Sequence, residues 1–333
     1  MFEYLQYLIL LVTTIYNFIT TKKENEEQLP PGELIDIGGY RLHLYSKGRG
    51  KPTVILDHSL GGLDGYFIID SLAELTQVCI YDRAGYGWSD SAKPYGKKRK
   101  IVPRNSEIIT IELEILLAKA KIEPPYILIG DSFGSYNMRL YAHKHRDKVA
   151  GIIFVDGLHE SAMLDMPLSI IMLKSLFFSG FLFSAIGAFL GIIRIIGNCG
   201  LFEVIKPQLN KFKPDIKDRV KRSFYRPKHW LTMVREMWHL DSSGEYLKTA
   251  NDLDRIPIIN IKSQTFFKKS FFTWFLPLKA IDRLRNRIHE NLSLLSTNYS
   301  QINASRSSHF VWIDEPELIV NAVVKMLHAT STD

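Results

Sequence analysis

Tyr126-Ile-Leu-Ile-Gly-Asp-Ser-Phe-Gly134 joins an apolar run directly to the pattern G-x-S-x-G. Residues 127–129 are apolar and partly β-branched, which predicts a buried strand, and the residues from Ser132 to His145 predict a helix. A G-x-S-x-G between a strand and a helix is typical of a nucleophile elbow, a sharp turn that exposes one serine hydroxyl. Its glycines remove the Cβ atoms that would clash where strand and helix meet. The pattern therefore predicts that Ser132 is a nucleophile.

Three further segments surround this motif in a fixed order: Thr53-Val-Ile-Leu-Asp-His58 with Ser59-Leu60-Gly61-Gly62, then Val78-Cys-Ile-Tyr-Asp-Arg-Ala-Gly-Tyr-Gly-Trp-Ser89, then Ser308-His309-Phe310 with Asp314-Glu-Pro-Glu317. They resemble the H-G-x-x-G loop, the Y-D-R-x-G-x-G-x-S run and the catalytic-histidine loop of alpha/beta hydrolases. The chain thus resembles this superfamily, in its serine-nucleophile, esterase- and lipase-like branch with a cap insertion. Ser132 argues against the epoxide hydrolase and dehalogenase branches, whose members carry aspartate at this position.

The resemblance implies an α/β fold with a mostly parallel, doubly wound sheet and a helical cap inserted after the sixth strand. The residue pattern points the same way, because buried apolar strands alternate with helical segments such as Ser106–Lys121. The predicted strands are Glu33–Ile37, Tyr40–Tyr45, Thr53–His58, Gln77–Asp82, Tyr126–Gly130, Ala150–Asp156, Pro257–Ile261 and Tyr299–Asn303. We expect residues 33–158 and 256–329 to form the hydrolase core and residues 159–255 to form the cap.

The N-terminus is the first of two long apolar segments. Tyr4 to Thr21 are eighteen uncharged residues closed by two lysines, a length that just reaches the range of a spanning helix. Asn17 and several threonines weaken this interpretation. We predict a single N-terminal membrane anchor over residues 1–23 and a polar linker over residues 24–32. An apolar helix packed on the cap or on a partner is the alternative, and the side of the membrane on which the core lies stays open.

The second apolar segment, Ser175 to Ile193, also has the hydropathy of a transmembrane helix. A span there would put the two halves of the core on opposite sides of a bilayer, so we predict cap helices that cover the active site. Nine basic and two acidic residues follow between Lys206 and Lys228, and Lys97–Lys100 is a second basic cluster. No nucleic-acid recognition fold accompanies this charge. We expect no nucleic-acid partner, and the basic segment fits either anionic lipid headgroups or an ordinary solvated face.

Composition narrows the chemistry further. The 333 residues are 46% hydrophobic and 23% charged, which is ordinary for a globular protein and excludes wholesale disorder. Two cysteines, Cys79 and Cys199, exclude a disulfide scaffold. Neither H-E-x-x-H nor C-x-x-C occurs, so the sequence gives no support to metal catalysis, and no cofactor is expected.

A serine nucleophile requires a general base and an acid that orients it. His309 is the predicted base, because it lies six residues after Asn303, where the last strand ends. Most alpha/beta hydrolases place the acid after the seventh strand, but this chain has no carboxylate from Asn260 through Lys268, and Asp282 is the next one. Some branches place the acid after the sixth strand. We therefore predict Asp156 as the acid, with Asp282 as the alternative.

The resemblance also implies an oxyanion hole built from the backbone N–H groups of Leu60 and Phe133. Ser59 stands where the family usually has glycine. Asp82 and Arg83 are expected to tie the fourth-strand turn to its neighbours. The predicted function is a membrane-associated serine hydrolase that cleaves an ester-type bond of a small or lipid-like acyl substrate through an acyl-enzyme on Ser132. The alternatives are a catalytically silent binding protein, an acyltransferase, and an amidase or aminopeptidase.

Overall fold

A computed structural model of the chain describes residues 2–93, 102–268 and 273–330, so the basic cluster Lys97–Lys100 lies outside the described residues. Eight strands form one sheet in the order β1-β2-β4-β3-β5-β6-β7-β8. Their bounds are Glu33–Asp36 (β1), Arg41–Lys47 (β2), Thr53–Asp57 (β3), Val78–Asp82 (β4), Tyr126–Asp131 (β5), Val149–Val155 (β6), Ile258–Ser263 (β7) and Tyr299–Ala304 (β8). β2 pairs antiparallel with β1 and β4, and the other neighbours run parallel. The predicted mostly parallel sheet is confirmed.

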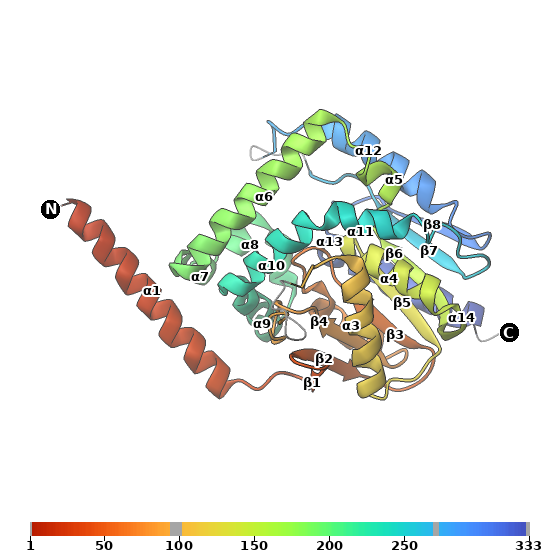
Figure 1. Cartoon of the computed structure of the whole chain (residues 1–333), viewed down its shortest axis with the longest axis horizontal. Helices are drawn as coiled ribbons and strands as arrows, with labels where there is room; N and C mark the ends of the chain where they lie inside the picture. The colour runs from red at the N-terminus through yellow and green to blue at the C-terminus, as the bar shows by residue number, and fades with distance from the viewer. Residues whose placement is uncertain (1, 94–101, 269–272, 331–333) are drawn as a thin grey trace.

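Helices cover both faces of this sheet (Figure 1). One face packs on α3 (Ser106–Lys119), α4 (Phe133–Lys144) and α12 (Leu278–Leu292). The other face packs on α2 (Ile69–Ala73) and α14 (Pro316–Thr330). Successive side chains of a strand point to opposite faces, so a strand between two helical layers must be apolar throughout. β5 meets this requirement with every residue buried, which explains why its sequence predicted a strand so clearly.

The segment between β6 and β7 is helical. It contains α5 (Glu160–Met163), α6 (Leu168–Phe189), α7 (Ile192–Asn198), α8 (Leu201–Ile205), η3 (Pro207–Lys211), α9 (Pro214–Phe224), α10 (Pro227–Trp238) and α11 (Leu240–Leu247). The remaining short helices are η1 (Asp64–Phe67), η2 (Arg146–Lys148) and α13 (Val311–Asp314). α6 packs lengthwise against α10 above the core (Figure 1). This segment is where the cap was predicted.

The N-terminal helix α1 (Phe2–Glu27) extends along the side of the cap and reaches the sheet only through the turn before β1 (Figure 1). It continues to Glu27, four residues into the segment that was predicted to be linker. Ion pairs one turn apart, Lys22–Glu26 and Lys23–Glu27, support this last part of the helix. By length and composition, α1 and α6 are both apolar enough to cross a membrane.

Candidate active site

Ser132 lies in the turn between β5 and α4. Its φ of +46° is unusual for a residue with a side chain, so the turn is strained. Tight packing leaves room only for glycine at both ends of the motif. A Cβ atom on Gly130 would lie 2.6 Å from the Ser135 Cα, and one on Gly134 would lie 2.5 Å from the Asp57 carbonyl oxygen. The close approach of strand and helix therefore explains both glycines of the motif.

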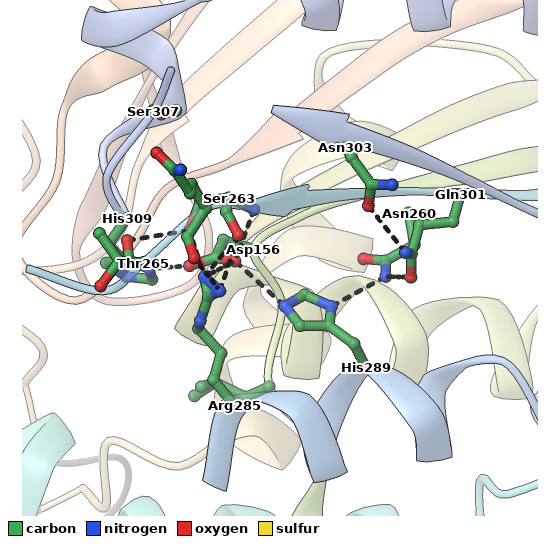
Figure 2. A network of polar contacts seen from close by, with 12 residues as sticks. Asp156, Asn260, Ser263, Thr265, Arg285, His289, Gln301, Asn303, Ser307 and His309 are labelled. Atoms are coloured by element: carbon green, nitrogen blue, oxygen red, sulfur yellow. Dashed lines mark hydrogen bonds and ion pairs between the residues drawn. The ribbon is translucent and has the colours of Figure 1, made fainter. Parts of the chain in front are cut away.

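Asp156 follows the neighbouring strand β6 in a turn of the same kind, with φ of +42°. The Ser132 N–H donates to the Val155 carbonyl at 3.0 Å, so the two turns lie side by side. The carboxylate Oδ2 of Asp156 accepts a hydrogen bond from Nδ1 of His309 at 2.7 Å (Figure 2). This bond fixes the proton on Nδ1 and leaves Nε2 of His309 as the nitrogen that can accept a proton.

His309 comes from the loop between β8 and α13. Its N–H donates to the Phe266 carbonyl at 3.2 Å, and its ring stacks on that of Phe266 with 4.2 Å between centroids. In the described part of the chain, no hydrogen bond joins His309 to Ser132. Such bonds are often long before substrate binds. The arrangement provides a serine, an imidazole and a carboxylate at the carboxyl ends of three strands.

The loop that carries His309 corrects one sequence prediction. The acidic pattern Asp314-Glu-Pro-Glu317 predicts a last helix that begins at Asp314, but α13 ends there and α14 begins at Pro316. Proline suits a first helical position because it has no N–H to satisfy. The Asp314 carboxylate instead accepts hydrogen bonds from the N–H and Oγ of Ser308, at 2.9 and 2.7 Å. It therefore holds the residue that precedes His309.

The alternative acid, Asp282, has a different neighbour. Its Oδ1 accepts a hydrogen bond from Oγ1 of Thr265 at 3.1 Å, and no hydrogen bond links it to His309 among the described residues. Asp156 is therefore the carboxylate that geometry favours as the partner of the imidazole.

Asp156 has further partners that the sequence did not reveal (Figure 2). Its Oδ1 accepts hydrogen bonds from Nε2 of His289 at 3.1 Å and from the N–H of Ser263 at 3.1 Å. Nδ1 of His289 in turn accepts from the Asn260 amide at 2.8 Å, which fixes its tautomer. Arg285, one turn before His289 on α12, lies 3.4 Å from the same carboxylate oxygen. In the sequence, the i, i+4 spacing of Arg285 and His289 indicates only that both lie on one face of a helix. It does not show which strand that face contacts.

These contacts determine the charge of the acid. Burial by itself raises the pKa of Asp156, but the hydrogen bonds from His289 and His309 outweigh burial and hold the pKa well below its usual range. Burial lowers the pKa of His289, which opposes its protonation beside Asp156. The carboxylate is therefore ionised at neutral pH and ready to stabilise an imidazolium at His309.

The two amides expected to bind an oxyanion come from the elbow itself and from the loop after β3. Phe133 is the first residue of α4, a position whose N–H has no partner within a helix. Leu60 lies in the loop after β3, and Arg83 fastens that loop. Its guanidinium donates to the carbonyl oxygens of His58 and Ser59 at 2.7 and 2.9 Å.

Arg83 is also the centre of a buried charge network. It donates to Asp57 on β3 at 2.6 Å and to both carboxylate oxygens of Glu236 on α10 at 2.9 Å. Tyr86 donates to the same Glu236 at 2.7 Å. All of these side chains are almost fully buried. A single guanidinium thus joins the core, the Leu60 loop and a helix of the segment between β6 and β7.

We expect Arg83→Met to lower the free energy of unfolding by about 3–5 kcal/mol, because it leaves two buried carboxylates without their cation. Urea unfolding followed by circular dichroism measures the change. Arg287→Met is the matched control, since the Arg287 side chain is 42% exposed and its ion pair with Asp165 contributes little. Equal stability of the two variants would contradict a structural role for the Arg83 network.

Two carboxyl groups, Asp64 and Asp131, lie close to Ser59 in the loop after β3. Asp131 directly precedes Ser132 and is 3% exposed, and Asp64 Oδ2 accepts from Oγ of Ser59 at 3.4 Å. Burial raises the pKa of Asp64 to about 6. Burial raises the pKa of Asp131 well above its usual value, and the charge of Asp64 is the second largest cause. The pair therefore retains a proton close to neutral pH.

The stability of the protein should respond to this proton. The unfolded chain releases it near the ordinary aspartate pKa of 3.8, whereas the folded chain holds it to about pH 6. Stability from this group is thus present at low pH and is lost as pH rises across that window. Asp64→Asn lacks this titrating carboxyl and also the charge that raises the pKa of Asp131, so its stability relative to the parent should increase between about pH 4 and about pH 8. Urea unfolding at both pH values tests this, and a constant difference would contradict it.

Among the described residues, no three histidine, cysteine, aspartate or glutamate side chains are grouped as metal ligands. A cavity of about 390 Å³ lies at the amino end of β5, beside Tyr126, Lys121 and Tyr141. Ser132 follows the opposite end of that strand, so this cavity belongs to a different edge of the sheet.

Comparison with known proteins bears on the fold. Residues 52–194 match the family described as alpha/beta hydrolase fold. The uncharacterized protein YbdG of Bacillus subtilis is 24% identical over 156 residues, which are 45% of this chain and 46% of that protein. The matched region covers less than half the length of each of the first curated relatives.

Solved structures resemble the chain over most of its length. The epoxide hydrolase CorEH superposes with a TM-score of 0.60 and 18% identity, covering 89% of this chain and 98% of that one. The enol-lactonase of Burkholderia xenovorans has a TM-score of 0.60 and 15% identity, covering 89% of this chain and 100% of that one. At these identities the likeness establishes the fold, and the chemistry must be argued from the side chains.

Proposed function

Because this chain belongs to the alpha/beta hydrolase superfamily, we propose that it is a serine hydrolase that cleaves an ester-type bond through an acyl-enzyme on Ser132. The observation that carries the proposal is the 2.7 Å hydrogen bond between Asp156 and Nδ1 of His309, formed beside the strained turn of Ser132. It orients the imidazole from the β8 loop against Asp156, which follows β6, the strand next to the nucleophile's own.

The proposed reaction follows from these positions. Nε2 of His309 takes the proton of Ser132 Oγ as that oxygen attacks the carbonyl carbon. The N–H groups of Leu60 and Phe133 donate to the resulting oxyanion, and each such donor is worth about 10²–10³ in rate. His309 then protonates the leaving alcohol. Water, activated by the same histidine, releases the acid and restores Ser132.

The surroundings of His309 favour an acyl chain as the substrate's apolar part. A series of aromatic contacts leads away from the histidine ring. Phe266 stacks on it, Phe267 contacts Phe266 at 4.7 Å between centroids, Phe177 contacts Phe267 at 6.1 Å, and Phe181 contacts Phe177 at 6.3 Å. The last two phenylalanines belong to α6. We therefore propose a lipid-like acyl substrate, and an association of the enzyme with membranes through its N-terminal helix.

Fluorophosphonate labelling of the full-length protein tests the proposal. We expect one adduct by intact mass, located on the peptide that contains Ser132, and faster turnover of esters than of amides with the same acyl group. Product analysis with an added alcohol separates hydrolysis from acyl transfer, which uses the same acyl-enzyme. An unlabelled but folded protein would favour the silent binding protein instead.

A further inference from the structure

Several polar side chains of α1 face the cap and form hydrogen bonds there. Oγ1 of Thr13 donates to the Leu190 carbonyl at 2.7 Å, and the amide of Asn17 donates to the Ala188 carbonyl at 2.8 Å. Both carbonyls belong to the end of α6, just before the turn into α7 at Gly191. A Cβ atom on Gly191 would lie 2.4 Å from the Thr13 carbonyl oxygen, so the two segments touch backbone to backbone. We call residues 183–195 the α6–α7 corner.

Arg194 fastens this contact. It is 2% exposed, although it lies in an otherwise apolar helix. Its guanidinium donates to Oδ1 of Asn17 at 2.7 Å, to Oγ1 of Thr21 at 2.9 Å and to the carboxylate of Glu24, and it lies over the Tyr225 ring at 4.7 Å. Breaking a buried ion pair on one side leaves an uncompensated charge. α1 and the α6–α7 corner are therefore held together as one body.

The outer faces of the same two segments are apolar and exposed. On α1, Phe18 is 72% exposed and Ile19 is 59% exposed, and on the corner Phe183 is 71% exposed and Phe189 is 62% exposed. Isolated exposed apolar residues are common on protein surfaces. Here, however, they cover the outer faces of α1 and of the α6–α7 corner, which are in contact, and a continuous apolar surface of this kind marks a contact site.

The charges at the end of α1 indicate what covers this surface. Glu24 lies one turn beyond the last residue of the apolar segment, Thr21. It lines a small hollow together with Arg219, Arg222 and Arg226. Arg226 lies 3.9 Å from its carboxylate, and Arg194 donates to the same carboxylate, so arginines outnumber carboxylates around this hollow. Cations beside the end of an apolar helix match the level of anionic phosphate headgroups.

The depth of the contact follows from helix geometry. At about 1.5 Å per residue, the Thr13 contact lies about 12 Å along α1 from Thr21. If the apolar segment of α1 enters a bilayer to Thr21, its partners at Ala188 and Leu190 must enter too. We propose that α1 and the α6–α7 corner insert together into a bilayer that contains anionic phospholipid. The inference does not depend on the catalytic assignment.

An environment-sensitive fluorophore on a single cysteine tests this directly. Phe189→Cys reports on the corner, and Lys325→Cys, exposed on α14, is the matched control. Both are made with Cys199→Ser. Cys79 can stay, since it is 1% exposed and burial raises the pKa of its thiol to about 11. The full-length proteins are mixed with phosphatidylcholine vesicles, with and without phosphatidylglycerol, that carry a nitroxide quencher in the acyl chains.

We expect the probe at 189 to shift to shorter wavelength and to be quenched several-fold, more strongly with phosphatidylglycerol, while the probe at 325 stays unchanged. A probe at 189 that remains in water while the protein co-sediments with vesicles would overturn the proposal, because α1 would then insert alone. A blue shift without vesicles would also overturn it, since a second copy of the chain would be covering the surface.

Two variants test the joint insertion. Arg194→Met removes the charged link, and Asn17→Ala is a milder change should Arg194→Met fail to fold. In either background the probe at 189 should lose part of its quenching, while a probe at exposed Leu11→Cys on α1 keeps its own. Unchanged quenching at 189 in both variants would show that the corner inserts independently of α1.

Discussion

Ser132→Ala is expected to abolish ester hydrolysis, with a fall in kcat on the order of 10³-fold or more. Without the hydroxyl no acyl-enzyme forms, and only the oxyanion donors and substrate binding remain, which preserve a small residual rate over water. The substitution removes one oxygen from a turn whose shape is set by Gly130 and Gly134, so the fold should persist. Initial rates on a chromogenic ester and fluorophosphonate labelling measure the effect.

Ser300→Ala is the matched control for this variant, because Ser300 is an exposed serine on β8. It should retain both labelling and turnover. If Ser132→Ala and the parent protein label equally, the nucleophile is another residue. If both are folded and neither labels, the chain keeps the fold without the chemistry.

The second large effect is expected at the acid. Asp156→Asn should lower kcat by about 10⁴-fold, because an amide NH₂ facing Nδ1 favours the wrong tautomer of His309 and removes the charge that stabilises its protonated form. KM should change little, since Asp156 is buried behind the histidine. Steady-state kinetics on a soluble ester measure both parameters, and thermal unfolding checks the fold.

Asp282→Asn is the comparison that makes this result informative. Asp282 contacts Thr265, so its loss should leave the rate within a few-fold of the parent. The reverse pattern, with a slow Asp282→Asn and a nearly normal Asp156→Asn, would reassign the acid to the segment after β7. Similar losses in both variants would indicate that the His309 loop depends on each of them structurally.

The sheet was predictable because its central strands carry their own signal. Ile127 and Leu128 pack on opposite faces of β5, and both faces are covered, so the strand had to be a continuous apolar run. The turn at Ser132 was predictable for a related reason. The close packing of strand and helix permits only glycine at two fixed positions, and such a constraint is visible in sequence.

The surroundings of Asp156 were not predictable in this way. His289 and Asn260 are 29 residues apart and meet only because α12 packs against the side of β7. A histidine on an amphipathic helix has the same sequence appearance whether it faces water or a carboxylate. The partners of Asn17 were not predictable either. Its amide N–H donates to the Ala188 carbonyl and its amide oxygen accepts from Arg194, both of which lie far away in sequence.

Arg83 joins Glu236 on α10 to the carbonyl oxygens of the loop that carries Leu60. A ligand that displaces α10 should therefore pull on the loop whose amide we propose as an oxyanion donor. Poorly fitting acyl groups should consequently be discriminated in turnover as well as in affinity, because misfit above the site is transmitted to the transition state below it. Selectivity in this protein would then depend on the connection from α10 through Arg83 to the Leu60 loop. It is measurable across a series of esters as kcat values that fall while KM values rise.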